Sequence, residues 1–271
     1  MPKSVLVTGC SSGIGHSLAL EFNAHGLRVF ATARNKESIS DLAENGIETF
    51  SLEVTDPESI RTLQEDIFAR TVGKLDYLVN NAGRNYTVPA LDLDMDEVRG
   101  TFETNVFAIM RMCQTFAPLL IESKGTIVQI GSIAGVLPYV FGSAYNASKA
   151  ALHSYSDALR VELSPFGVRV VTVVTGGVIS NIGRTTRTLS EDSIYLPLAE
   201  EYHARQSQSQ VLGMRNEDYA KSVATQVLAG RKKTIWEGGK SWLVWFAYWF
   251  LPKWVLVSCP RLGKCGGTWN R

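Results

Sequence analysis

The sequence is poor in the residues that build metal centres and disulfide scaffolds. It has four cysteines and four histidines in 271 residues, and none of them forms a CxxC pair or an HExxH motif. We therefore expect reduced thiols and no structural or catalytic metal. The apolar stretch that begins at Ser4 is also too short for a secretory signal peptide, so we expect the catalytic part to face the cytosol.

The chain lacks a strong net charge as well. At +1, the balance gives no reason to expect nucleic acid as a partner. This average hides an asymmetry, because eight of the 27 lysines and arginines lie after Gly230, together with a single acid, Glu237. All six tryptophans lie in the same part. The C-terminal segment therefore forms a different kind of surface from the rest.

Short β-branched runs alternate with longer stretches of helical period. The expected strands are Ser4–Thr8, Arg28–Ala33, Glu48–Leu52, Leu75–Asn80, Gly125–Ile130 and Arg169–Thr175. This alternation predicts an α/β fold, a doubly wound parallel sheet of the Rossmann type. We expect one domain over residues 1–240. Within it, the polar segment at about 179–213 leaves a late strand and is interpreted as a substrate lid.

Glycines occupy the turn between the first strand and the first helix. Such a turn lets the backbone approach a pyrophosphate, and the helix N-terminus adds free N–H groups. A tight turn without a ligand has the same pattern. The cofactor-binding residues predicted here are Gly9, Ser11, Ser12, Gly13, Ile14 and Gly15.

The end of the second strand lacks the acid that would bind an unmodified ribose. No Asp or Glu lies between Glu21 and Glu37, and Arg34 stands at the strand end instead. A guanidinium there pairs with a 2′-phosphate, which favours NADP(H) over NAD(H). The alternative is a solvated surface arginine.

Further motifs follow in a fixed order. These are Asn80-Asn81-Ala82-Gly83 after a strand, Asn105 in a helix, Ser132 at a strand end, and Tyr145-Asn146-Ala147-Ser148-Lys149. In order and spacing they resemble the short-chain dehydrogenase/reductases over residues 4–180. The resemblance implies an oxidoreductase whose cofactor site includes Asn81, Ala82 and Gly83.

The resemblance also implies the catalytic roles. Tyr145 would protonate the substrate carbonyl, and Lys149 would bind the nicotinamide ribose. Ser132 would hydrogen-bond the carbonyl, and Asn105 would hold a relay water. Because Tyr145 and Lys149 are four apart on a helix, we expect the ammonium to lower the phenol pKa. His153, one turn further, is interpreted as a packed histidine without a catalytic role.

Two positions depart from the family pattern. Glu53-Val54 replaces the usual Asp-Val, and we expect Glu53 to reach the adenine amino group. Thr175-Gly176 replaces the usual Pro-Gly, so we expect a looser entry to the lid. Val178 and Ser180 would contact the carboxamide and phosphate regions of the cofactor.

The tail, residues 241–271, begins with a run from Ser241 to Leu251 that is apolar almost throughout. It is too short for a straight membrane span, whereas its aromatic residues favour the headgroup boundary. The basic residues Lys240, Lys253, Arg261 and Lys264 suit anionic lipids. We expect a monotopic anchor on the cytosolic face of an intracellular membrane, the endoplasmic reticulum or a lipid droplet. An oligomer interface or a flap over the substrate pocket are the alternatives.

An anchored reductase suggests a lipophilic ketone as its substrate. The Thr-Gly-Gly-Val sequence at Thr175, the Ser193-Ile194-Tyr195 segment and the apolar extension resemble members that reduce 1-acyldihydroxyacetone phosphate to lysophosphatidic acid. Arg84, Arg184 and Arg187 are then candidates for binding the phosphate, or else ordinary solvated charges.

Two other functions stay open at this point. One is a ketoreductase of secondary-metabolite biosynthesis acting on a polyketide, terpenoid or steroid-like ketone. The other is a membrane-tethered NADPH-binding scaffold without turnover. The family resemblance also suggests a homodimer that pairs through the helices bearing Asn105 and Tyr145.

Overall fold

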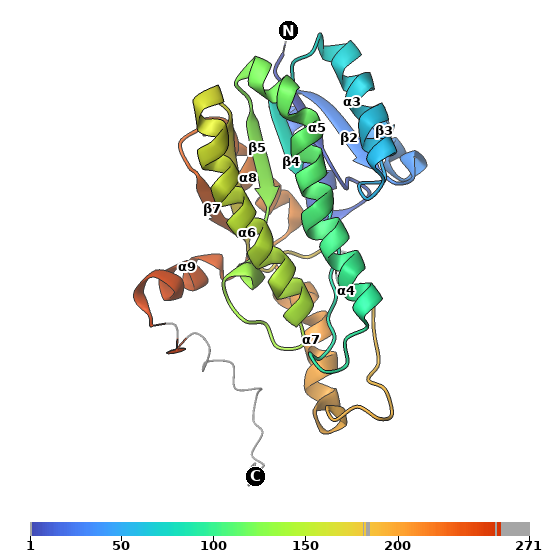
Figure 1. The fold of residues 1–271 in the computed structure, drawn as a ribbon, viewed down its shortest axis with the longest axis vertical. Coiled ribbons are helices and arrows are strands. Elements are labelled where there is room, and N and C mark those ends of the chain that lie inside the picture. Colours follow the sequence, from blue (N-terminus) through green and yellow to red (C-terminus); the bar gives the residue numbers. More distant parts are fainter. Residues whose placement is uncertain (1, 181, 183–184, 253, 256–271) are drawn as a thin grey trace.

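The computed structural model describes residues 2–180, 182, 185–252, 254 and 255. The predictions for Arg184, Lys253, Arg261 and Lys264 therefore lie outside the described residues, as does most of the tail. The described residues form a seven-stranded sheet in the order β3-β2-β1-β4-β5-β6-β7, and every neighbouring pair is parallel (Figure 1). The strands are β1 Ser4–Val7, β2 Arg28–Ala33, β3 Glu48–Ser51, β4 Tyr77–Asn80, β5 Thr126–Ile130, β6 Arg169–Thr175 and β7 Thr234–Glu237.

The predicted doubly wound α/β fold is confirmed, and the six expected strands are all present. The strand order reverses between β1 and β4, so the crevice for a ligand opens at the carboxyl ends of these two strands. The seventh strand, β7, was not predicted. It has four residues, of which Ile235 alone is fully buried, so it carries too little periodicity to be recognised.

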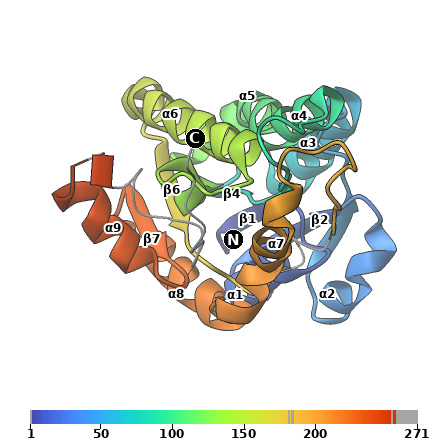
Figure 2. The ribbon, with the colours of Figure 1, turned by 90° about the horizontal axis from the view of Figure 1, so that it is seen from below.

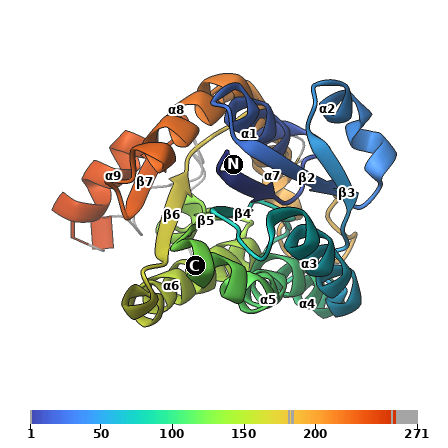
Figure 3. The same ribbon diagram turned by 90° about the horizontal axis from the view of Figure 1, so that it is seen from above.

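Helices cover both faces of the sheet. Figure 3 shows α1, α2 and α8 on one face and α3, α4, α5 and α6 on the other. Each layer has its own apolar core: Phe22 and Val223 pack beneath the first, Phe116 and Leu152 beneath the second. These helices are α1 Gly13–Ala24, α2 Ser40–Glu44, α3 Pro57–Thr71, α4 Met95–Phe102, α5 Ala108–Ser123, α6 Ser143–Leu163 and α8 Asn216–Ala229, with the short helices η1 Lys36–Ile39, η3 Ile133–Gly135 and η4 Ser164–Phe166.

The helical stretch Met95–Ser123 is long and apolar enough to cross a membrane by length and composition. It combines α4, the π-helical turn η2 Glu103–Phe107 and α5. Half of its most apolar window is buried, and α5 packs against α3 and the sheet. We therefore interpret it as a core helix of the second layer. Of the four cysteines, Cys10 and Cys113 are buried free thiols, as expected.

The expected lid contains a helix that the sequence pattern did not predict. After η6 Leu196–Leu198, helix α7 Ala199–Leu212 lies at the carboxyl edge of the sheet (Figure 2). Among the described side chains of α7, Tyr202 alone is fully buried; its hydroxyl donates to the Thr87 carbonyl at 3.0 Å and its ring meets Phe141 edge-on. One anchoring residue produces no apolar stripe, which explains why the helix was missed.

The start of the tail folds back onto the domain. Helix α9 Ser241–Phe250 follows β7, and Val244 packs with Ile133 and Val174. Most other side chains of the helix, and of the residues just after it, are open. Large apolar side chains are at least 41% exposed at Trp242, Leu243, Trp245, Phe246, Tyr248, Trp249, Phe250, Leu251 and Trp254. We call these nine residues the aromatic patch.

Candidate active site

The predicted catalytic tyrosine and lysine lie on one face of α6. Tyr145, Lys149 and His153 are four residues apart, so their side chains align along the helix toward the carboxyl ends of β5 and β6. Lys149 is buried, and its ammonium donates to the Ile130 carbonyl at 3.0 Å. The same nitrogen lies 5.8 Å from the centre of the Tyr145 ring. The two groups are therefore neighbours at the end of β5.

The lowered phenol pKa expected from the sequence is wrong. Burial raises the pKa of Tyr145 to about 12, although a hydrogen bond with Ser132 and the charge of Arg205 act in the opposite direction. Burial also lowers the pKa of Lys149 to about 8. The cost of desolvation thus exceeds the opposing effects of Ser132 and Arg205 on the phenol pKa. A phenol with a raised pKa is protonated at neutral pH, which is the form that donates a proton to a carbonyl.

Ser132 joins this pair from the end of β5. Its hydroxyl oxygen accepts from the Ala134 amide at 3.1 Å and so caps η3, and it also hydrogen-bonds Tyr145. The backbone N–H of Ser132 donates to His153 Nε2 at 3.3 Å. Ser132 is therefore held from two sides while its hydroxyl meets the phenol.

His153 occupies a slot that two glycines leave open. A methyl group on Gly131 would come within 2.3 Å of Nε2, and one on Gly135 within 2.7 Å of Cε1. Burial lowers the pKa of His153 to about 4, so the ring is neutral and accepts the Ser132 amide. The structure thus places His153 against the sheet end, in agreement with a packing role.

Asn105 lies in the π-helical turn between α4 and α5 and is fully buried. Its Oδ1 accepts from the Arg84 amide at 2.9 Å; its Nδ2 donates to the Arg84 carbonyl at 2.9 Å and to Ser148 at 3.0 Å. Both side-chain N–H groups of Asn105 already donate hydrogen bonds, so Asn105 could bind a relay water only through an oxygen that accepts a hydrogen bond from it. A methyl on Gly83 would lie 3.2 Å from Asn105 Oδ1 and 3.8 Å from the Lys149 ammonium nitrogen, so this glycine separates the two groups.

The glycine turn after β1 is built for close backbone approach. Gly9 and Gly13 have positive φ angles of 72° and 62°, which favour glycine. A methyl group on Gly15 would lie 2.3 Å from the Asn81 amide and 2.4 Å from the Gly9 carbonyl. The Asn81 side chain in turn donates to the carbonyls of Thr8 and Gly9 at 2.8 and 3.1 Å. Ser11 is exposed at the mouth of this turn, and Ser12 and Ile14 are partly buried.

The other predicted cofactor residues lie along the same edge. Arg34 is exposed at the end of β2, and among the described residues its guanidinium has no ion-pair partner. Glu53 accepts from the Thr55 amide and hydroxyl at 3.1 and 2.8 Å, and Val54 packs against the core. An open glycine turn beside an unpaired cation fits a pyrophosphate and a phosphorylated ribose.

The segment after β6 is held more firmly than expected. Gly177 exchanges hydrogen bonds with Gly239 at 3.1 and 2.8 Å, and Ile179 and Met214 extend the contact. The Thr175 hydroxyl, where the family has proline, hydrogen-bonds Tyr219 at 2.7 Å. These hydrogen bonds tie the lid entry to the segment after β7 and to α8, which argues against the predicted loosening. Val178 is buried in this segment, and Ser180 follows at the surface of the lid with a contact of its own.

Two of the candidate arginines for a substrate phosphate share one acid. The Glu97 carboxylate accepts from Arg187 at 2.9 Å and from Arg84. The Arg187 guanidinium also stacks over the Tyr86 ring, 4.8 Å from its centre. The stacking joins the lid to the loop after β4. The Glu97 carboxylate partly neutralises the charge of the two arginines.

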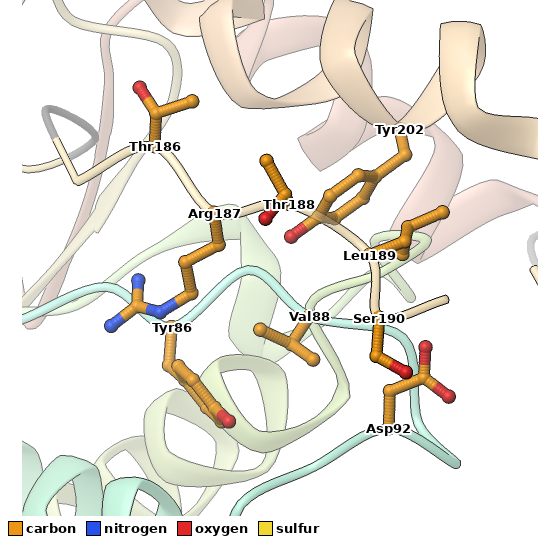
Figure 4. A pocket seen from close by; sticks show the side chains of 9 residues that line it. All are labelled: Tyr86, Val88, Asp92, Thr186, Arg187, Thr188, Leu189, Ser190 and Tyr202. Atoms are coloured by element: carbon orange, nitrogen blue, oxygen red, sulfur yellow. The ribbon is translucent and has the colours of Figure 1, made fainter. Parts of the chain in front are cut away.

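A pocket of about 410 Å³ opens beside this contact (Figure 4). Its described lining includes Tyr86, Arg187 and Tyr202 but none of the four predicted catalytic residues. The pocket therefore lies between the lid and the loop after β4, and the predicted catalytic residues do not line it.

One residue of the site was missed by the sequence reasoning. Arg205, on α7, lies with its guanidinium 4.4 Å above the centre of the Tyr139 ring and interacts electrostatically with Tyr145. Nothing in the local sequence distinguishes it from other lid charges, because its partners are about 60 residues away in the chain.

Comparisons with known proteins decide the family. The sequence profile of the short chain dehydrogenase family matches residues 3–190. The chain is a short-chain dehydrogenase. The oxidoreductase chemistry and the family resemblance predicted from the motifs are thereby confirmed.

Relatives of this short-chain dehydrogenase include several fungal proteins. It is 44% identical over 257 residues to the short-chain dehydrogenase srdE of Neurospora crassa, a match that covers 93% of this chain and 89% of that one. It is 45% identical over 202 residues to the NADPH-dependent 1-acyldihydroxyacetone phosphate reductase of Schizosaccharomyces pombe, covering 72% of this chain and 68% of that one. The crystal structure of a short-chain dehydrogenase from Streptomyces avermitilis superposes with a TM-score of 0.80 at 31% identity, covering 92% of each chain.

Proposed function

We propose that this short-chain dehydrogenase is an NADP(H)-dependent reductase of a lipophilic ketone. The observation that supports the chemistry is the meeting of Tyr145, Ser132 and Lys149 at the carboxyl end of β5. Arg34, exposed at the end of β2 where the sequence has no acid, supports NADP(H) over NAD(H).

Bound NADPH would supply the hydride. The residues of the chain then hold the carbonyl and supply the proton. The Ser132 hydroxyl and the protonated Tyr145 phenol donate to the carbonyl oxygen, and the phenol gives up its proton as negative charge develops there. The neighbouring ammonium of Lys149 stabilises the phenolate that remains. Asn105 holds the loop after β4 in place beside the lysine.

We propose 1-acyldihydroxyacetone phosphate as the substrate and lysophosphatidic acid as the product. The relative from S. pombe carries this activity in its name and is 45% identical over 202 residues, which cover 72% of this chain. A neutral lipophilic ketone, as in secondary-metabolite biosynthesis, is the second candidate. The relatives that match over more of the chain, such as srdE, have names that specify no substrate, so they leave this candidate open.

We further propose that α9 docks on the cytosolic face of an intracellular membrane. The aromatic patch faces outward, and tryptophan and tyrosine favour the headgroup boundary. With 10 residues, α9 suits a position in the plane of the interface. Pairing of two copies through the helices bearing Asn105 and Tyr145 stays a prediction.

The test of the activity is NADPH oxidation by the detergent-solubilised full chain with two ketones. These are 1-acyldihydroxyacetone phosphate and the matched 1-acyldihydroxyacetone without phosphate. Tyr145→Phe, which keeps the ring and removes the proton donor, is the control and should lose about 100-fold or more in kcat while still binding NADPH. Turnover of the neutral ketone alone would refute the glycerolipid assignment and favour the second candidate. Equal activity of Tyr145→Phe would refute the proposed chemistry.

A further inference from the structure

Helix α7 carries a cation, Arg205, into the active site, and no ion pair of its guanidinium is seen among the described residues. The Arg205 guanidinium stacks on the Tyr139 ring, and its Nε is buried without a hydrogen-bond partner. Burial lowers the pKa of Arg205, opposed only by interactions with the phenols of Tyr139 and Tyr145. A buried donor without a partner is costly, so a ligand that supplies an acceptor would be bound favourably.

Arg84 and Arg187, the two described arginines that were candidates for binding the phosphate, differ from Arg205 because each has an ion-pair partner. Arg84 and Arg187 share Glu97, so their charge is partly offset before any ligand arrives. Of these three arginines, Arg205 is the one whose charge acts on the pKa of Tyr145. Arg205 therefore combines an uncompensated charge with electrostatic proximity to the catalytic phenol.

The position of Arg205 suits the phosphate of a ketone whose phosphate lies close to the carbonyl group. In dihydroxyacetone phosphate esters a single methylene separates the carbonyl carbon from the phosphate oxygen. A cation that recognises the phosphate must therefore lie beside the group that protonates the carbonyl. Arg205 meets this requirement better than Arg84 or Arg187.

We propose that Arg205 binds the phosphate of the substrate next to the reacting carbonyl, and that α7 thereby selects phosphorylated ketones. The inference rests on the proposed reduction of 1-acyldihydroxyacetone phosphate. It assigns phosphate recognition to Arg205 in preference to Arg84 and Arg187. The neighbouring Gln206 supports the arrangement, because it exchanges hydrogen bonds with the backbone of Arg187 at 2.9 Å and ties α7 to the part of the lid that carries Arg187.

The experiment compares Arg205→Met and Arg205→Lys with the unaltered enzyme on the two matched ketones. For Arg205→Met, kcat/KM for the phosphorylated ketone should fall by about 10- to 100-fold, the range for a lost charge-assisted hydrogen bond. The neutral ketone should change by less than about threefold, and Arg205→Lys should recover part of the loss. Arg61→Met, which removes an exposed arginine on α3, is the control for net charge. Equal losses on both ketones would overturn the proposal and leave a structural role.

A binding measurement separates this proposal from the identity of the substrate. Dodecyl phosphate and dodecanol are titrated calorimetrically into the NADPH complex of each variant. The affinity for dodecyl phosphate should drop at least about tenfold in Arg205→Met, and that for dodecanol should not change. This result would support the phosphate site even if acyldihydroxyacetone phosphate were not turned over. Unchanged affinity for dodecyl phosphate would overturn the proposal whichever ketone is reduced.

Discussion

At the scale of single residues, the site is dominated by the cost of burying ionisable groups. Burial raises the pKa of Tyr145 and lowers that of Lys149, so both groups favour their neutral forms. For the phenol this is compatible with the reaction, since the neutral form is the proton donor. For the lysine it is not, because the reaction uses its charge. Lys149 is therefore a residue whose function opposes the stability of the fold.

The first prediction concerns the cost of burying Lys149, which makes the stability of the protein depend on pH. Lys149 has a pKa of about 8 in the folded protein against an ordinary value of 10.5. Between these values the unfolded chain binds a proton that the folded protein does not, so stability rises with pH through this window. Below about pH 8 the penalty is constant, on the order of 3 kcal/mol.

Lys149→Met removes the penalty together with the activity. Relative to the unaltered protein, the gain in its free energy of unfolding should be larger at pH 7 than at pH 10 by about 2 kcal/mol. Urea unfolding at both pH values measures this difference. Lys221→Met, at an exposed position on α8, should show none. A Lys149→Met effect that does not depend on pH would contradict the prediction.

The second prediction concerns the cofactor. Arg34→Ala should raise KM for NADPH by about 10- to 100-fold, because a charge-assisted hydrogen bond to the 2′-phosphate is lost. KM for NADH, which has no such phosphate, should stay within about threefold. Initial rates with both cofactors give the ratio. A parallel loss with NADPH and NADH would mean that Arg34 acts through the fold.

At the scale of elements, the lid begins at a contact between two glycine pairs. A methyl group on Gly176 would lie 2.5 Å from the Gly239 carbonyl, and Gly238 has a φ of 101°. The segment after β6 and the segment after β7 therefore approach more closely than side chains allow. This contact replaces the rigidity that a proline would have supplied at Thr175.

The third prediction tests this contact. Gly176→Ala should lower the free energy of unfolding by about 1–3 kcal/mol, since backbone atoms must move to admit the methyl group. Gly142→Ala is the control, because the nearest atom to its added methyl lies at 3.4 Å. It should change stability by less than about 0.5 kcal/mol. Denaturant unfolding of both variants measures the difference, and equal effects would argue against a close glycine contact.

At the scale of the whole molecule, the active site, the lid and the exposed helix α9 lie close together. The carboxyl edge carries the site and the lid, and α9 extends from β7 with Val244 packed near Ile133 (Figure 1). Because Ile133 follows Ser132 directly, the aromatic patch begins close to the substrate side of the molecule. This arrangement suits a substrate that enters from a membrane.

The fourth prediction addresses the aromatic patch. Replacing both Trp242 and Trp249, which are 70% and 65% exposed, by serine should weaken binding to phosphatidylcholine/phosphatidylserine vesicles by at least about tenfold. Cosedimentation measures the bound fraction. Phe68→Ser, which removes a 54% exposed aromatic side chain from α3, should have no effect. Vesicle binding that is unchanged in the tryptophan variant would exclude α9 as the docking element.

Much of the architecture could be predicted because it is written in local patterns. Six strands follow from β-branched runs, and the glycine turn and the Tyr145–Lys149 spacing follow from positions that are adjacent along the chain. Strand β7 and helix α7 could not be predicted in this way. Each is held by one or two buried residues, Ile235 and Tyr202, whose partners lie in distant segments.

The amino-acid sequence by itself determined the alternation of strands and helices, the cofactor turn and the catalytic motif, because periodicity and short spacings are covalent properties of the chain. The tertiary structure alone decided the direction of the Tyr145 pKa, the sharing of Glu97 by two arginines and the place of Arg205 over the Tyr139 ring. These depend on burial and on charges brought together across the sheet, and a low-dielectric interior reverses effects that would hold for the same residues in water.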